Sequence, residues 1–159
     1  MSPEIDITQE NQESMEAWFH HVLSPDQKLY QNGLIPMLKP QFVSCDYANK
    51  KLTLAYDVQE WEMNPQNAMH GGITVAAIDT AFGVLCHYFA KRKMVTTVTL
   101  STTYLKPIWL HDRIYVTATV TSIGKNLISM VAEVHTERDH LLVTTANTTF
   151  MVLKYTSPY

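Results

Sequence analysis

The chain has 159 residues, 46% of them hydrophobic and 10% aromatic, which suits one ordinary domain with a single core and argues against a second large one. Its formal net charge is -3 at pH 7, so the composition excludes a globally basic nucleic-acid-binding protein. The two cysteines form no disulfide framework or CxxC pair, and the acidic, polar start MSPEIDITQE does not resemble a secretory signal, so we expect a soluble, cytoplasmic protein.

An amphipathic helix is the first predicted element, over residues 13–23. Its apolar residues recur at intervals of three and four: Met15, Trp18, Phe19 and Val22. We assign this helix to an N-terminal extension, residues 1–35, and the rest of the chain, residues 36–159, to the main domain.

Six β-rich stretches follow, and Thr and Val dominate the last four. They cover residues 42–47, 51–60, 95–105, 113–123, 127–137 and 141–155. The last three are separated only by the short polar connections Gly124-Lys125-Asn126 and Arg138-Asp139-His140. Such connections predict an antiparallel meander.

A long apolar helix is predicted over residues 72–90, between the second and third strands. From Gly71 to Ala90 only Asp79 is ionised near neutral pH. The length would allow a membrane span, but a carboxylate near its middle is costly in a bilayer, and we expect no membrane contact. Because an antiparallel sheet needs a cover on its concave face, this helix is expected to fill that face.

A fixed spacing links the helix to polar residues on both sides of it. Asn64 lies six residues before the His70-Gly71-Gly72 segment, Asp79 lies seven after it, and a later strand ends in Tyr104-Leu105-Lys106-Pro107. This pattern resembles the hotdog-fold acyl-CoA thioesterases of the PaaI-like family, over roughly residues 42–154. The resemblance implies an α+β hotdog fold, in which a curved antiparallel sheet of five or six strands wraps a long central helix. Asn67 departs from the glycine that the family often has, but asparagine tolerates a left-handed turn.

The glycines at the helix start predict a site for partial negative charge. The first amides of a helix lack acceptors within it, and glycine lets a substrate carbonyl approach the backbone. The carbonyl oxygen gains charge during thioester hydrolysis, and each donor aimed at it is worth about 3 to 4 kcal/mol. The resemblance implies that the Gly71 amide donates to this oxygen, that Asn64 adds a side-chain donor and that His70 orients the amide. Taken singly, the glycines also fit a tight turn, His70 a helix cap or core histidine, and Asn64 an ordinary loop.

Asp79 is costly to bury inside a helix unless it has partners or faces a wet cleft. A partnered core aspartate is one interpretation. The functional interpretation makes it a general base that activates water or a nucleophile that attacks the thioester, and the sequence leaves both routes open. The resemblance adds Thr97 to position the water, although Thr97 also fits a simple strand residue.

The separation of Asp79 from Gly71 predicts an oligomer. Asp79 lies about 10 Å along the helix from its start, so one helix can hardly present both groups to one carbonyl. In a twofold dimer, Asp79 of one chain can face Gly71 of the other. We therefore expect at least a dimer, and the resemblance adds that four subunits are common.

The substrate implied by the resemblance is an acyl-CoA with an aromatic or medium-chain acyl group. The predicted substrate-binding residues are Gly72, Tyr104, Lys106, Lys125 and Asn126, and the expected acyl-pocket residues are Met63, Met69, Phe82 and Leu85. Coenzyme A is part of the substrate, so no separate cofactor is expected. No histidine spacing predicts a metal site, and no nucleic-acid partner is expected.

Two other functions stay open at this point. A non-catalytic acyl-CoA-binding or sensing module could have the same fold, although an intact Asp79 argues against it. A hydratase or dehydratase relative is disfavoured, because its histidine would usually be followed by a proline and a glycine.

Overall fold

The computed structural model describes residues 9–156, which form helices and one sheet. The helical elements are α1 (Gln12–Val22), η1 (Lys28–Tyr30), α2 (Ile35–Leu38), η2 (Glu60–Glu62) and α3 (Gly71–Phe89). The strands are β1 (Gln41–Asp46), β2 (Lys51–Asp57), β3 (Lys93–Tyr104), β4 (Arg113–Ile123), β5 (Leu127–Thr136) and β6 (Leu142–Thr156). The three short helices η1, α2 and η2 were not predicted from the sequence.

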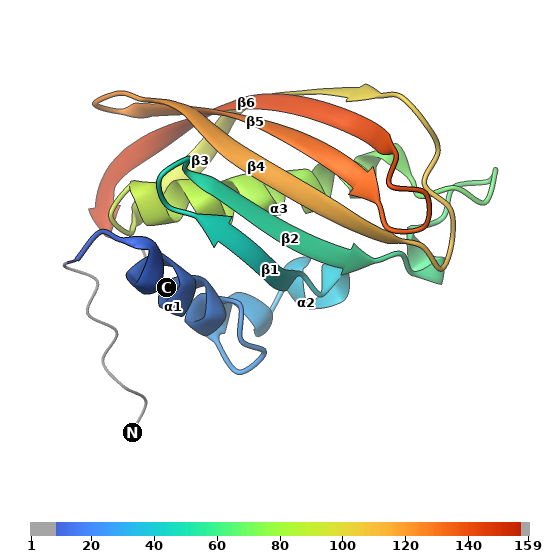
Figure 1. Cartoon of the computed structure of the whole chain (residues 1–159), viewed down its shortest axis with the longest axis horizontal. Coiled ribbons are helices and arrows are strands. Elements are labelled where there is room, and N and C mark those ends of the chain that lie inside the picture. Colours follow the sequence, from blue (N-terminus) through green and yellow to red (C-terminus); the bar gives the residue numbers. More distant parts are fainter. Residues whose placement is uncertain (1–8, 157–159) are drawn as a thin grey trace.

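The six strands form one antiparallel sheet in the order β1-β2-β4-β5-β6-β3, which curves around α3 (Figure 1). The predicted meander of the last three strands is confirmed, because β5 pairs with β4 on one side and β6 on the other. Strand β6 also pairs with β3, which ends the sheet. No other strand within residues 9–156 pairs with the outer edge of β3. The hotdog fold expected from the sequence is confirmed.

Helix α3 fills the concave face of the sheet, as predicted. It is long and apolar enough to cross a membrane by length and composition, but in this fold its apolar residues pack on the protein's own strands. Ala77, Ile78 and Phe82 are fully buried in the core. The Tyr56 hydroxyl donates a 2.9 Å hydrogen bond to the Ala77 carbonyl and so ties β2 to the middle of the helix.

Helix α1 packs beside β1 and belongs to the same hydrophobic core as the sheet (Figure 1). Asn11 caps it, accepting a 2.9 Å hydrogen bond from the Ser14 amide. The Gln12 side chain donates to the Cys45 carbonyl at 2.9 Å and accepts from the Tyr47 amide at 2.8 Å. The predicted amphipathic helix is thus confirmed, and it is fastened to the edge of the sheet.

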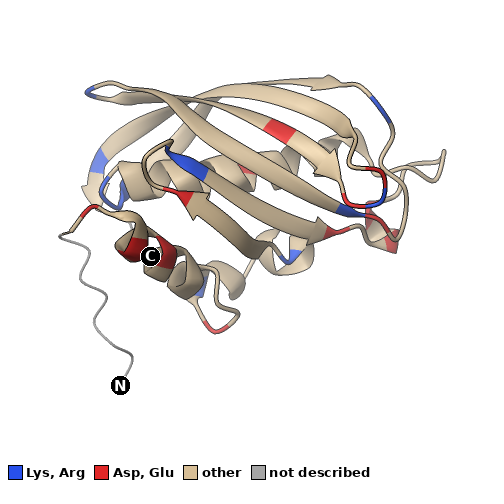
Figure 2. Cartoon of the chain, viewed as in Figure 1, with Lys and Arg blue, Asp and Glu red and all other residues tan. Residues whose placement is uncertain are grey.

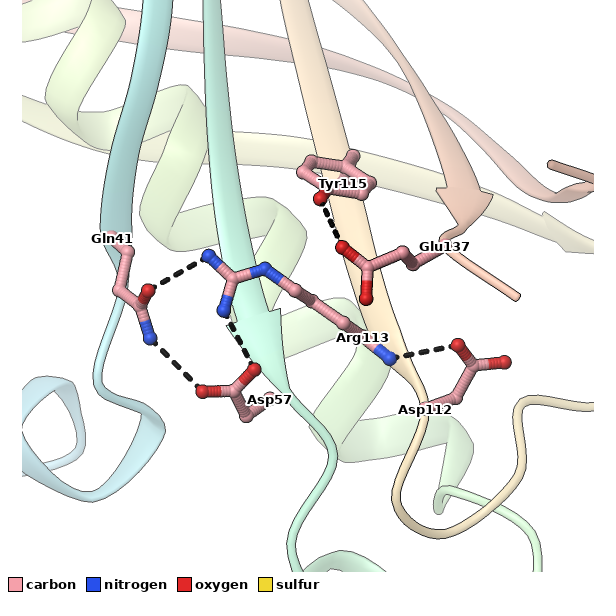
Figure 3. A network of polar contacts seen from close by, with 6 residues as sticks. All are labelled: Gln41, Asp57, Asp112, Arg113, Tyr115 and Glu137. Atoms are coloured by element: carbon pink, nitrogen blue, oxygen red, sulfur yellow. Dashed lines mark hydrogen bonds and ion pairs between the residues drawn. The ribbon is translucent and has the colours of Figure 1, made fainter.

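A polar network fastens β1, β2 and β4 together near one end of the sheet (Figure 3). Arg113 Nη1 donates to Asp57 Oδ1 at 2.7 Å, and its Nη2 donates to Gln41 Oε1 at 2.8 Å. Because Asp57 is exposed, this ion pair is worth at most about 1 kcal/mol.

Figure 2 shows acidic and basic residues scattered mainly over α1, the strand ends and the connecting loops.

Candidate active site

The start of α3 leaves one backbone donor free. His70 is the N-cap, and its Nδ1 accepts a 2.9 Å hydrogen bond from the Gly72 amide. The amides of Ile73 and Thr74 donate to the His70 carbonyl. Within residues 9–156, no acceptor takes the Gly71 N–H. His70 therefore engages the second glycine amide, and the first remains available to a ligand at the positive end of the helix dipole.

Tyr104 fixes the position of Gly71 from the end of β3. Its hydroxyl donates a 2.8 Å hydrogen bond to the Gly71 carbonyl, and burial raises the pKa of this phenol, which keeps it a donor at neutral pH. A Cβ atom at position 71 would lie 3.0 Å from the same hydroxyl. A larger residue at this position would crowd the Tyr104 hydroxyl, a closeness that the sequence pattern did not reveal.

The loop before α3 holds Asn64 in an Asx-type turn. Asn64 Oδ1 accepts from the Gln66 and Ala68 amides at 2.9 and 3.1 Å, and Asn67 adopts the left-handed φ of 60°. The tolerance predicted for asparagine at position 67 is therefore confirmed. In the described chain the Asn64 side-chain amide NH₂ has no acceptor, so it can donate to a substrate oxygen.

Two consecutive links fix this loop to the body of the protein. Glu62 in η2 is almost fully buried, its Oε2 accepts from the Gln59 amide at 3.0 Å, and burial raises the pKa of its carboxyl group. The Glu62 carbonyl in turn accepts a 2.7 Å hydrogen bond from the His70 amide. The residues Asn64, Gly71, Tyr104 and Lys106 line one pocket of about 380 Å³. We call these four residues the amide half-site.

Asp79 lies two turns further along α3, beside β3. The Thr97 hydroxyl donates a 2.9 Å hydrogen bond to Asp79 Oδ1, and no donor in residues 9–156 binds Oδ2. The β3–β6 register shifts between Thr97 and Thr99, which leaves Val98 as the extra residue of a β-bulge. A bulge re-aims the neighbouring side chains. We call Asp79 and Thr97 the acid half-site, and they border a second pocket, of about 370 Å³.

The two half-sites do not meet within one protomer. Gly71 and Asp79 are about 12 Å apart along the axis of α3, by a rise of 1.5 Å per residue. They also line different pockets. Lys125 and Asn126 lie in the turn after β4, whereas Lys106 precedes that strand, so Lys106 is separated from them by roughly 33 Å of extended chain. The predicted site residues therefore fall into three groups on a single chain.

The residues expected in the acyl pocket do not lie together in the structure. Phe82 and Leu85 are fully buried on the core side of α3, and neither borders the two pockets described above. Met69 lines the amide half-site pocket, and Met63 pairs with it in an isolated β-bridge. The pocket beside Asp79 is lined instead by another face of α3, by β3 and by the N-terminal helices. The amphipathic pattern of residues 13–23 was the available signal for this contribution.

No group of three or more His, Cys, Asp or Glu side chains is placed to hold a metal ion within residues 9–156. Seven histidines in the sequence had suggested testing for one. The polar groups of the two half-sites are the Asp79 carboxylate, the hydroxyls of Thr97 and Tyr104, the Asn64 side-chain amide, the Lys106 ammonium group and the Gly71 N–H.

Comparison with known families defines the class of the protein. Residues 66–143 match the family model of the thioesterase superfamily. That range contains Gly71, Asp79, Thr97 and Tyr104, while Asn64 lies just before it. Over residues 66–143 the chain is thus similar to the thioesterase superfamily, and together with the hotdog fold this similarity supports a thioester hydrolase.

Three solved structures show the same fold at low sequence identity. The chain is similar to zebra fish thioesterase superfamily member 2, with a TM-score of 0.73 and 18% identity over 91% of this chain and 100% of that one. It is similar to the Escherichia coli PaaI protein, with a TM-score of 0.71 and 19% identity over 79% and 88% of the two chains. A Streptococcus mutans protein bound to acetyl-CoA gives a TM-score of 0.67 and 17% identity over 83% and 97%. No curated protein matches the chain in sequence.

Proposed function

We propose that the protein hydrolyses acyl-CoA thioesters in a site shared by two protomers. The acid half-site of one protomer would face the amide half-site of its partner across a twofold axis. The observation that carries this proposal is the complementarity of the half-sites: one holds a free Gly71 N–H, the other a carboxylate with one free oxygen, and α3 keeps them apart. The Streptococcus mutans protein of the same fold, bound to acetyl-CoA, supports the choice of coenzyme A esters.

The outer edge of β3 supports a dimer. This strand is 12 residues long, and its unpaired backbone groups are open along its length within the described chain. Such an edge is a template for pairing with another strand, and a second copy of β3 would pair with it in an isologous contact. Thr97 lies on this strand, so pairing there would bring the acid half-site close to the partner.

The chemistry follows from the free groups. The substrate carbonyl oxygen would accept hydrogen bonds from the Gly71 amide and the Asn64 side chain, which stabilise the negative charge that develops on it. In the general-base route, Asp79 takes a proton from water, the resulting hydroxide adds to the carbonyl carbon, and the C–S bond breaks. The coenzyme A thiolate then receives the proton. Thr97 holds Oδ1 and leaves Oδ2 for the water.

The nucleophilic route uses the same groups. Asp79 Oδ2 adds to the carbonyl carbon, the C–S bond breaks, and a mixed anhydride forms as the coenzyme A thiolate leaves. Water then hydrolyses the anhydride to the free acid and the original carboxylate, and the proton released goes to the thiolate. Lys106, Lys125 and Asn126 would bind the phosphates and polar groups of coenzyme A. Lys106 lies before β4, whereas Lys125 and Asn126 lie after it, so one ligand would contact Lys106 of one protomer and Lys125 and Asn126 of the other.

Release of free thiol from a panel of acyl-CoAs tests the proposed function. Asp79→Asn removes the base or nucleophile and should lower kcat about 10²- to 10⁴-fold. Asp139→Asn makes the same change in the exposed β5–β6 turn and should leave kcat unchanged. If the wild type and Asp79→Asn are equally inert and both still bind acyl-CoA, the protein is instead a binding or sensing module.

A further inference from the structure

We propose that the N-terminal helices close the acyl pocket and restrict the substrate to apolar acyl groups of medium length. The acyl pocket is the cavity of about 370 Å³ beside Asp79. This inference rests on the proposed function, because it takes Asp79 as the group at which the thioester reacts.

One face of α3 forms a straight wall of this pocket. Asp79, Thr80, Gly83, Val84 and His87 all line it, and their spacing places them along one stripe of the helix. Opposite them, Thr97 lies beside Asp79, and β3 runs back past Val95 to Met94. The pocket therefore extends from the carboxylate toward the C-terminal end of α3.

Gly83 keeps this wall open in the middle. A glycine inside a helix costs about 0.5–1 kcal/mol relative to alanine. A Cβ atom at this position would meet only Phe150, at an ordinary contact distance of 3.9 Å. Packing within the chain therefore does not require glycine here. The space that a larger side chain would fill is part of the acyl pocket.

Residues of the N-terminal segment close the other sides and the far end. Trp18 and Val22 of α1, Leu29 of η1 and Ile35 of α2 all line the pocket. The rings of Trp18 and His87 are 6.0 Å apart, which places Trp18 at the end opposite Asp79. The Arg92 guanidinium lies 4.5 Å from the centroid of the Trp18 ring and supports it by a cation–π contact. None of these four wall residues lies in the range that matches the family.

The chemistry of the wall selects an apolar chain. Its charged and hydroxyl groups, Asp79, Thr80, Thr96 and Thr97, gather at the reactive end. At the far end, Trp18 Nε1 and His87 Nε2 are both buried out of contact with solvent, so these atoms are not presented to a ligand. Burial lowers the pKa of His87, which keeps its imidazole uncharged at neutral pH.

The depth of the pocket sets the length of the chain. From Asp79 to His87 the helix rises about 12 Å. An extended alkyl chain with C–C bonds near 1.5 Å advances roughly 1.3 Å per carbon, so the stripe matches about eight to ten carbons. A single aromatic ring would leave the far end empty, and a much longer chain would meet Trp18.

Chain-length selectivity tests this inference, with kcat/KM measured for acetyl-, benzoyl-, octanoyl- and hexadecanoyl-CoA. The wild type should prefer octanoyl-CoA by at least about tenfold over the other three. Gly83→Leu should lower the octanoyl-to-acetyl ratio at least about tenfold, because its side chain fills the pocket. Trp18→Leu should open the far end and raise the hexadecanoyl-to-octanoyl ratio. Trp61→Leu is the matched control, because Trp61 lies outside this pocket and should leave both ratios unchanged.

Each outcome bears on one claim. If the wild type releases thiol but prefers hexadecanoyl- or benzoyl-CoA, or if the Gly83 and Trp18 variants keep its ratios, the inference is wrong while the proposed function stands. If no acyl-CoA is hydrolysed, the proposed function fails, and calorimetric titration with octanoate then tests the pocket alone. Binding to the wild type with loss in Gly83→Leu would support the pocket, and equal affinity of the two proteins would overturn it. Thermal unfolding of each variant confirms that it is folded.

Discussion

The hydrogen bond between Thr97 and Asp79 gives the carboxylate a defined orientation. It connects the middle of α3 to a bulged part of β3, and it leaves one carboxylate oxygen without a donor. In the proposed mechanism Thr97 acts through Asp79, as a positioning residue. The hydrogen bond shows that Thr97 is a partner of Asp79 and not only a strand residue, and kinetics of Thr97 variants is needed to assign it a role in the reaction.

We predict that Thr97→Val lowers kcat about 10- to 100-fold, the effect of losing one hydrogen bond to a charged group worth roughly 1.5–3 kcal/mol. The substitution keeps the shape and the β propensity of the side chain. Thr97→Ser restores the hydroxyl and should recover most of kcat. A purely structural role would give the opposite ranking, with serine the poorer replacement in the strand. Steady-state kinetics of the two variants decides between these outcomes.

Single residues were predictable from the sequence where their spacing carried information. Asp79 stood out because it is the lone charge of an apolar helix, and the glycines stood out because they precede that helix. The contact of Tyr104 with Gly71 was not predicted, because 33 residues separate them and the sequence pattern that contains both does not show which atoms meet. The same holds for the choice of Gly72 as the amide that His70 engages.

At the level of elements, strand positions followed from alternation and from turn residues, but strand order did not. The β2–β4 and β3–β6 pairings join segments that are far apart in the chain, and propensity contains no information on such pairings. The burial of the two α3 residues Phe82 and Leu85 was not predicted, for a related reason. A helix that is apolar on nearly every side shows no stripe, so Phe82 and Leu85 could not be assigned to the core rather than the pocket.

The contact between α1 and α3 predicts a pH dependence of stability. Burial lowers the pKa of His87, an effect opposed by a backbone hydrogen bond with Arg92 and assisted by the charge of Arg92. The unfolded chain, with a histidine pKa near 6.5, therefore binds this proton at a higher pH than the folded protein. Because the unfolded state then holds more protons, the free energy of unfolding should fall as the pH drops below about 6.5.

Urea unfolding above and below this pH measures the effect. We expect His87→Gln to show a smaller loss of unfolding free energy on acidification than the wild type. His140→Asn, in the exposed β5–β6 turn, should retain the full dependence. Equal slopes for the wild type and His87→Gln would show that the buried imidazole is not the group responsible.

On the scale of the whole molecule, the resemblance found in the sequence covered the fold but not the whole site. The family match ends before the N-terminal helices, yet Trp18 and Val22 of α1 form part of the wall beside Asp79. Amphipathic spacing predicted helix α1 and its buried face. It did not predict the surface on which α1 packs, because that surface depends on how the sheet curves. The separation of Gly71 from Asp79 was predicted from the rise of an α-helix per residue alone, and the structure places these two residues in separate pockets.

A site shared between protomers can be tested by mixing two inactive variants, Asp79→Asn and Asn64→Ala. In the homodimer of either variant, both shared sites carry the same defective half-site. A heterodimer would have one intact site, built from Asp79 of the Asn64→Ala chain and Asn64 of the Asp79→Asn chain. Its other site would lack both residues. Random exchange of equal amounts makes half of the dimers mixed, so thiol release should return to about a quarter of the wild-type rate for an isologous dimer. No recovery of activity, with exchange of subunits confirmed, would contradict a shared site and the account built on it.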